Sequence, residues 1–186
     1  MYRCLVANRG EIAVRIIRAC REMGIETVAL YAKGDEKSLH VSLADQAVCI
    51  GEANPLDSYL NIERIIGAAE ITGSNAIHPG YGFLSESTTF AQKVEENDIH
   101  FIGPNKKTME MMGDKITARQ TVHSAGVPVI PGSTDAVNSV EEIKELAKDI
   151  GYPLVLKAAS GGGGKGIRIV KEENQLEKSL KEAKSE

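Results

Sequence analysis

The chain has 186 residues, of which 42% are hydrophobic and 26% are charged, which is ordinary for a globular protein. Its formal net charge of −4 and its aromatic content of 4% give no reason to expect nucleic acid or an anionic membrane as a partner. No apolar run approaches the roughly 20 residues of a membrane-spanning helix.

The three cysteines are an odd number without CxxC spacing. Cys4 lies in a predicted strand and Cys20 on an apolar helix face, so we expect Cys4, Cys20 and Cys49 to be reduced core thiols rather than metal or redox groups. The first three residues enter a predicted strand directly, so we expect no signal or transit peptide. We therefore expect a cytoplasmic protein.

Strand and helix patterns alternate along the first part of the chain. Short apolar runs predict strands over 4–7, 27–31, 47–50, 76–78 and 101–102. Helical spacing of apolar residues predicts helices over 12–23, 58–72 and 87–97. This alternation is typical of βαβ units, so we expect an α/β fold with a parallel sheet that ends near Gly113.

The rest of the chain predicts a second, smaller unit. Two helices are expected over 106–125 with a break at 113–114, and Pro128, Pro131 and Gly132 mark a hinge or a boundary. Next comes a helix with capping-box spacing at 139–142. It is followed by strands over 154–157 and 167–170 and by a last helix from about residue 172 or 174. A two-stranded sheet is only marginally stable alone, so we expect the second domain to be truncated. We expect a first domain over 1–113, a helical linker over 114–131 and this truncated domain over 132–186.

The strongest local signal is the run of glycines between the last two strands. It comprises Ser160, Gly161, Gly162, Gly163, Gly164, Lys165 and Gly166. Without Cβ atoms, backbone N–H groups can approach phosphate oxygens closely, and Lys165 and Lys157 would add positive charge there. The run predicts a phosphate-binding loop.

Two familiar phosphate motifs fail on context. A Walker A loop requires Gly where the chain has Ala159, and Ser or Thr where it has Gly166. A dinucleotide fingerprint must open a helix, whereas a strand follows here. A strand–loop–strand hairpin favours the ATP-covering flap of kinases and ATP-grasp enzymes. The alternative, a hairpin tip without a ligand, is disfavoured because four glycines cost much backbone entropy.

Two turns are expected at the carboxyl ends of strands, where open α/β sheets bind ligands. Residues 8–11 follow the first strand, although Glu11 also suits a helix N-terminus, and residues 78–86 follow the fourth. His78 in that second turn is more typical of a hydrogen-bonded structural residue than of a ligand. Lys115 is either a phosphate contact or a solvated lysine, and its spacing does not decide between them.

Several segments together resemble biotin carboxylases. They are residues 7–18, 58–62, 78–86, 101–104 and 112–115 and the glycine loop, in matching order and spacing. The resemblance covers essentially the whole chain and is highly specific. Carbamoyl-phosphate synthetases share the architecture but are not similar over 78–86.

The resemblance implies a Rossmann-like pre-ATP-grasp domain followed by an incomplete ATP-grasp lid subdomain. The family phosphorylates bicarbonate with Mg-ATP, and the carboxyphosphate carboxylates biotin on a carrier protein. Lys115, Lys157, Gly161–Gly164, Lys165 and Gly166 would contact ATP; Tyr81 and Gly82 would lie near biotin; and Arg18 and Glu22 would belong to a dimer contact.

The family's magnesium-binding glutamates, its bicarbonate-binding arginine and its general base would all lie beyond Glu186. We therefore expect no catalytic residue and no metal ligand here, and no activity from this chain alone. The implied partners are a biotin carboxyl carrier protein and a carboxyltransferase, within a homodimeric enzyme most typical of acetyl-CoA carboxylase and fatty acid biosynthesis. The alternatives are another ATP-grasp ligase, such as a carbamoyl-phosphate synthetase relative that uses ammonia, or a non-catalytic nucleotide-binding module.

Overall fold

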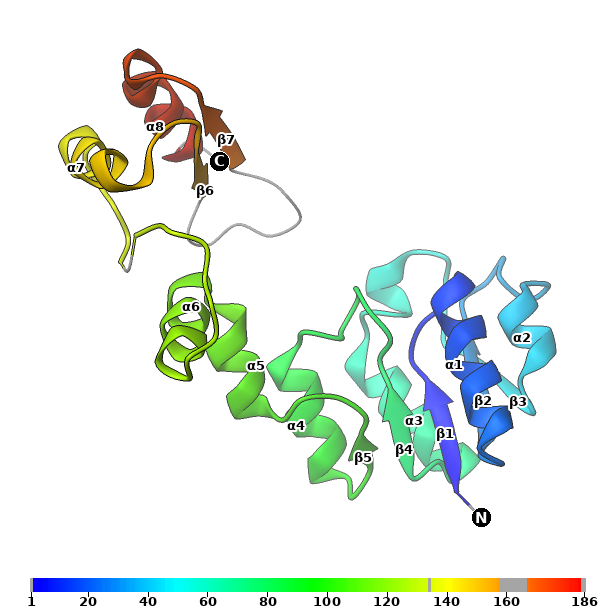
Figure 1. Ribbon diagram of the computed structural model, residues 1–186. Coiled ribbons are helices and arrows are strands. Elements are labelled where there is room, and N and C mark those ends of the chain that lie inside the picture. The colour runs from blue at the N-terminus through cyan, green and yellow to red at the C-terminus, as the bar shows by residue number, and fades with distance from the viewer. Residues whose placement is uncertain (1, 134, 158–166, 185–186) are drawn as a thin grey trace. The chain divides into compact units, whose positions relative to one another are not determined.

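A computed structural model describes residues 2–133, 135–157 and 167–184 (Figure 1). The chain divides into two compact units, Met1–Glu110 and Met111–Glu186. This division falls within a single helix, α5 (Lys106–Gly113), and groups the following helix with the second unit. The separate linker over 114–131 stays a prediction.

The first unit is built on a five-stranded parallel sheet (Figure 1). Its strands are β1 (Arg3–Val6), β2 (Glu26–Tyr31), β3 (Gln46–Cys49), β4 (Ala76–His78) and β5 (His100–Phe101). They lie in the order β3-β2-β1-β4-β5, and every neighbouring pair is parallel. The predicted α/β fold with a parallel sheet is confirmed.

Helices cover both faces of this sheet because alternate strand residues point to opposite sides. On one face, Cys4 and Val6 pack against α1 (Gly10–Glu22) and the end of α2 (Leu39–Leu43). On the other, Leu5 and Ile77 pack with α3 (Ile62–Thr72), α4 (Thr88–Glu96) and Met109 of α5. The buried residues of α1 recur at helical spacing: Ala13, Ile16, Ile17 and Cys20. The predicted helix there is confirmed.

Two local features differ from the sequence prediction. The third helix begins at Ile62 rather than at residue 58, because the side chain of Asn61 accepts the N–H of Arg64 and caps the helix. A short 3₁₀ turn, η1 (Pro55–Asp57), precedes it, and the hydrogen-bonded turn between them carries the fully buried Tyr59. Helix α2 was not predicted, because five residues are too few for a periodic signal.

The second unit contains α6 (Lys115–Ser124), α7 (Val140–Ile150), β6 (Leu154–Lys157), β7 (Ile167–Val170), η2 (Glu173–Gln175) and α8 (Leu176–Lys184). The antiparallel pair β6–β7 buries one face, and its cluster consists of Ile143, Ala147, Leu154, Leu156, Val170 and Leu176. The predicted break between α5 and α6 is confirmed, because Asp114 caps α6 through the N–H of Thr117 at 2.7 Å.

Two further details refine the predictions for this unit. Ser139 accepts the N–H of Glu142, as its capping-box spacing predicts, but the Glu142 carboxylate accepts from Asn138 instead of Ser139. In the predicted hinge, the Arg119 guanidinium donates to the carbonyls of Ile130 and Gly132. That part of the hinge is therefore tied to α6.

No helix among residues 2–133, 135–157 and 167–184 is long and apolar enough to cross a membrane.

The prediction of core thiols holds for two of the three cysteines. Cys4 and Cys20 are buried and free, whereas Cys49 is exposed because it lies on the edge strand β3. Burial raises the pKa of the Cys4 thiol to about 12 and also raises that of Cys20. Both buried thiols are therefore held in the unreactive protonated form.

Alkylation at pH 8 should separate these thiols. We expect iodoacetamide to modify Cys49 at least about a hundredfold faster than Cys4 or Cys20 in the folded protein, because burial limits both access and the thiolate fraction. Mass spectrometry of timed samples measures the rates, and in urea all three should react alike. Rapid modification of Cys20 in the folded protein would contradict the packing of α1.

Candidate functional site

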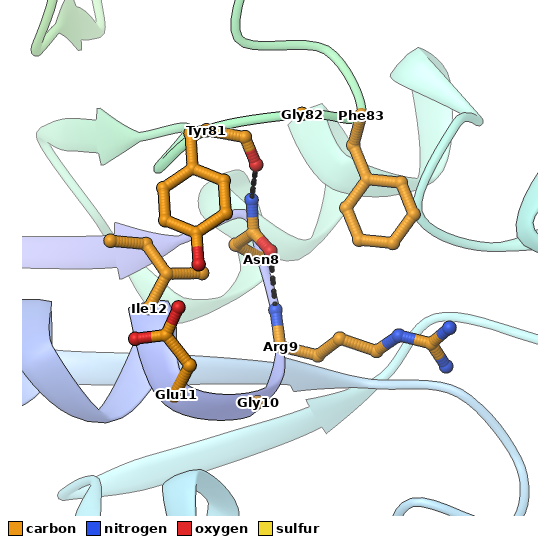
Figure 2. Close-up of a pocket in the computed structure, with 8 residues that line it drawn as sticks. All are labelled: Asn8, Arg9, Gly10, Glu11, Ile12, Tyr81, Gly82 and Phe83. Carbon is orange, nitrogen blue, oxygen red and sulfur yellow. Dashed lines mark hydrogen bonds between the residues drawn. The ribbon is translucent and has the colours of Figure 1, made fainter. Parts of the chain in front are cut away.

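The candidate site lies where the order of the parallel sheet reverses. The strands β2 and β4 flank β1 on opposite sides, and the turn after β1 meets the loop after β4 at their carboxyl ends. Crevices of this kind are where open α/β sheets bind ligands. The pocket there has a volume of about 390 Å³ and is lined by Asn8, Arg9, Gly10, Glu11, Ile12, Tyr81, Gly82 and Phe83 (Figure 2).

Asn8 joins the two sides of this pocket. Its side chain is buried, and its Nδ2 donates to the carbonyls of Pro79 and Tyr81, both at 2.8 Å. Its Oδ1 accepts the N–H of Arg9 at 2.9 Å (Figure 2). One buried amide thus satisfies three polar groups of two segments that lie 71 or more residues apart in the sequence.

The loop after β4 depends on glycines at two positions. Gly80 and Gly82 have φ values of +67° and +69°, which L side chains rarely adopt. A Cβ on Gly80 would lie 2.8 Å from Nδ2 of Asn8, whereas one on Gly82 would meet nothing within 4 Å. The Gly80 site is therefore restricted by packing as well as by its backbone.

His78 has a structural role in this loop. Its Nδ1 accepts the N–H of Gly80 at 3.0 Å, and burial lowers the pKa of its imidazole. The neutral ring is required for that bond, since a protonated Nδ1 cannot accept. The geometry favours the structural interpretation of His78 over a ligand role.

A second set of contacts lies on the other side of the loop. The rings of Tyr59 and Phe83 stack with centroids 5.1 Å apart, and the Arg9 guanidinium lies 5.2 and 5.7 Å from their centroids. Arg9 also pairs with Asp35 at 3.2 Å. The sequence did not single out Tyr59 or Asp35, although Tyr59 falls within a segment that carries the family resemblance.

Tyr81 and Gly82 occupy the middle of the loop. The Tyr81 side chain is 58% exposed, and Tyr81 lines the pocket together with Glu11 and Ile12 of the first turn of α1 (Figure 2). The structure therefore brings the predicted biotin-proximal residues together with the turn after β1. A contact with biotin itself stays a prediction.

The predicted ATP contacts lie in the second unit. Lys157 is exposed at the end of β6, on the same face as Val155 and opposite Ile167 and Ile169 of β7. This face is apolar and exposed, whereas Leu154 and Leu156 on the other face are buried. Gly161, Gly162, Gly163, Gly164, Lys165 and Gly166 lie outside the described residues.

Lys115 is the first residue of α6, directly after its cap, and it is exposed. The positive end of the helix dipole disfavours a cation at this position, so Lys115 does not stabilise α6 through the dipole. The backbone N–H groups at the N-terminus of α6 and the positive charge of Lys115 would together attract an anion.

The predicted dimer residues lie on the outer face of α1. Arg18 and Glu22 are exposed one turn apart. They line a groove of about 860 Å³ together with Gly10, Glu11, Val14, Arg15, Ser38, Leu39 and His40. Within the part of the chain that the structure describes, no group of three His, Cys, Asp or Glu residues is placed to hold a metal ion.

The two glycines offer a matched test of the loop geometry. We expect Gly80→Ala to lower the free energy of unfolding by about 2–3 kcal/mol, because it combines backbone strain with overpacking against Asn8. Gly82→Ala should cost only about 1 kcal/mol, since backbone strain acts alone. Urea unfolding monitored by circular dichroism measures both, and equal losses would contradict the Gly80–Asn8 packing.

Acid should weaken this loop through His78. Because the pKa is lowered in the folded state, the unfolded chain takes up the proton more readily, and stability falls as pH decreases below about 6.5. In His78→Asn, a carboxamide oxygen can accept the Gly80 N–H without titrating, so the fall between pH 7 and 5 should be smaller. Urea midpoints at each pH compare the two proteins, and identical pH profiles would refute this role.

Known proteins resemble this chain in sequence and in structure. The family profile described as "Biotin carboxylase, N-terminal domain" matches residues 1–109, and that described as "Carbamoyl-phosphate synthase L chain, ATP binding domain" matches residues 114–186. Biotin carboxylase 1 of Bacillus subtilis is 54% identical over 177 residues, which are 95% of this chain and 39% of that protein.

Two solved structures of biotin carboxylases also resemble this chain. The biotin carboxylase of Campylobacter jejuni, in a complex with β,γ-ATP, is 50% identical with a TM-score of 0.90, over 99% of this chain and 41% of its own. The biotin carboxylase domain dimer of the Hydrogenobacter thermophilus 2-oxoglutarate carboxylase, with MgADP, ADP and bicarbonate, is 53% identical with a TM-score of 0.85, over 97% and 40%. The chain thus spans about two fifths of these relatives, and it belongs to the biotin carboxylase N-terminal domain family.

Proposed function

We propose that this chain is the N-terminal part of a biotin carboxylase, an ATP-grasp ligase that uses ATP and bicarbonate to carboxylate biotin on a carrier protein. The observation that carries the proposal is the 54% identity with Biotin carboxylase 1 of Bacillus subtilis over 95% of the chain, which extends through both units. A carbamoyl-phosphate synthetase relative is disfavoured, because named biotin carboxylases match the second unit together with the first.

In this proposal the second unit binds the nucleotide. Lys157, with the glycine loop and Lys165, would neutralise phosphate charge, and Lys115 would add a cation at the N-terminus of α6. The exposed apolar face of β6–β7 supports the same role, because Val155, Ile167 and Ile169 would otherwise remain in contact with water. Clustered cations offset the charge of ATP and bicarbonate as the two are brought together.

The first unit would receive biotin. Tyr81 and Gly82 border the pocket at the reversal of the sheet order, where a preformed loop can orient a ring and help to exclude water from a reactive phosphate. The described residues contain no carboxylate cluster for magnesium. The resemblance assigns that ion, which supplies charge neutralisation on the phosphates, to residues beyond Glu186.

Arg18 and Glu22 would contribute to a homodimer. Their helix face also carries Arg15 and Glu11 in the same groove, so it presents both signs of charge. A patch with both signs suits an isologous interface, in which each charge can meet its opposite on a second copy. The solved 2-oxoglutarate carboxylase domain of Hydrogenobacter thermophilus is a dimer.

The acceptor of the carboxyl group is set by a separate carboxyltransferase. Relatives of similar identity include the 2-oxoglutarate carboxylase small subunit of Hydrogenobacter thermophilus, at 53%, and this part of the protein therefore does not separate the acceptors. The acetyl-CoA system, the carrier protein, the carboxyltransferase and a cytoplasmic location remain predictions.

The activity can be tested with a chimera. The chain is fused in frame to the C-terminal part of Biotin carboxylase 1 of Bacillus subtilis, from which the matched segment has been removed. We expect ADP release from Mg-ATP by the chimera to require bicarbonate and to rise with free biotin, whereas the chain alone is inactive. The intact relative is the positive control, and turnover driven by ammonia but not by biotin would instead favour the carbamoyl-phosphate synthetase alternative.

Lys157 should matter for the nucleotide in this chimera. We expect Lys157→Gln to raise the KM for ATP by about tenfold or more, because a charge-assisted contact with phosphate is lost, and to leave the KM for biotin unchanged. Lys178→Gln is the matched control, since that side chain is 84% exposed on α8. Equal effects of the two substitutions on the KM for ATP would refute the role of Lys157.

A further inference from the structure

We propose that Arg9 is a positioning residue for the loop that carries Tyr81 and Gly82, and that it acts through the stacked rings of Phe83 and Tyr59. The inference rests on the proposed function, because it concerns how that loop is held for biotin. Figure 2 shows that the Arg9 side chain runs beneath Phe83 rather than toward Tyr81. Although Arg9 is part of the pocket lining, its guanidinium is engaged with Asp35 and the two rings, so its effect on the ligand would be indirect.

Phe83 needs support, because its backbone is in an uncommon conformation. Its φ of +41° lies in the left-handed region, which a bulky residue other than glycine rarely occupies. Such a conformation persists only when surrounding contacts determine it. The ring of Phe83 supplies these contacts by stacking on Tyr59 at an interplanar angle of 9°.

Tyr59 provides a fixed base for this stack. The residue is fully buried, its hydroxyl donates to Asp35 at 3.0 Å, and the same oxygen accepts the N–H of Ala32 at 3.1 Å. Burial raises the pKa of this phenol, so it remains a neutral donor. The base is thus connected to the segment that follows β2.

Arg9 completes the arrangement. Its guanidinium lies within cation–π distance of both rings and pairs with the same Asp35 oxygen that accepts from Tyr59. A single planar cation therefore bridges the aromatic stack and its acidic anchor. Lysine would retain the charge but not the planar group that can lie against a ring while it donates to a carboxylate.

The loop is consequently fixed on both sides by two consecutive residues of one turn. Asn8 holds the carbonyls of Pro79 and Tyr81, and Arg9 holds Phe83 through its ring. Gly82, which has no Cβ to pack, lies between these two points. Loss of either contact would leave this middle segment free to move, and accurate placement of a substrate requires that such movement be small.

The test combines biotin kinetics with a structural measurement that does not depend on biotin. In the chimera we expect Arg9→Gln and Phe83→Leu each to raise the KM for free biotin about tenfold and to change the KM for ATP much less. Arg9→Lys should fall between Arg9→Gln and the unsubstituted chimera. Lys93→Gln, which removes a cation paired with the exposed Glu63 at 3.1 Å, is the matched control and should have no effect.

Hydrogen exchange of the 186-residue chain provides the second measurement. We expect amide exchange over residues 80–85 to become about fivefold faster in Arg9→Gln and Phe83→Leu, with exchange in β1 and β4 unaltered. If exchange is accelerated but the unsubstituted chimera shows no response to biotin, the positioning role stands and the proposed function fails. If exchange in both variants equals that of the unsubstituted chain, or the KM for biotin does not change in a biotin-dependent chimera, the positioning role is overturned.

Discussion

The pocket depends on the three hydrogen bonds of one buried amide, Asn8. Carbonyl groups in a tight loop over a buried sheet must find donors, because an unsatisfied buried carbonyl is costly. The two N–H groups of the Asn8 side chain donate to the carbonyls of Pro79 and Tyr81, and its Oδ1 accepts the N–H of Arg9. Aspartate has the same shape but would set a carboxylate oxygen against two carbonyls, so only an amide satisfies this set of partners.

The two units hold their functional residues in different ways. In the first unit, the pocket lies at the end of a sheet that is covered on both faces, so its walls are supported by two separate apolar clusters. In the second, a two-stranded sheet buries one face and exposes apolar side chains on the other. The first arrangement suits a preformed pocket, and the second suits a surface that becomes covered when a ligand binds.

The sequence predicted most of the architecture and less of the site. Strand and helix periodicity is local, so the parallel sheet and most helices could be inferred, as could the loops after β1 and β4. Tyr59 was missed as a site residue because its segment was placed in a helix, and only the cap at Asn61 shows that the helix begins later. Asp35 could not be found, since its contact with Arg9 depends on how β2 lies beside β1. The roles of Lys115, Lys157 and the glycine loop depend on a ligand and remain predictions.

The pairing of β1 with β4, which brings the two sides of the pocket together, also affects how the chain folds. The contacts of Asn8 join residues 71 and 73 positions apart, so they form only after a long loop has closed. A chain that has paired only β1 and β2 would possess the first turn but no pocket. Pocket formation therefore requires contacts between residues that are far apart in the sequence, and such contacts raise the contact order. A ligand that binds only the folded pocket would stabilise the whole first unit by mass action.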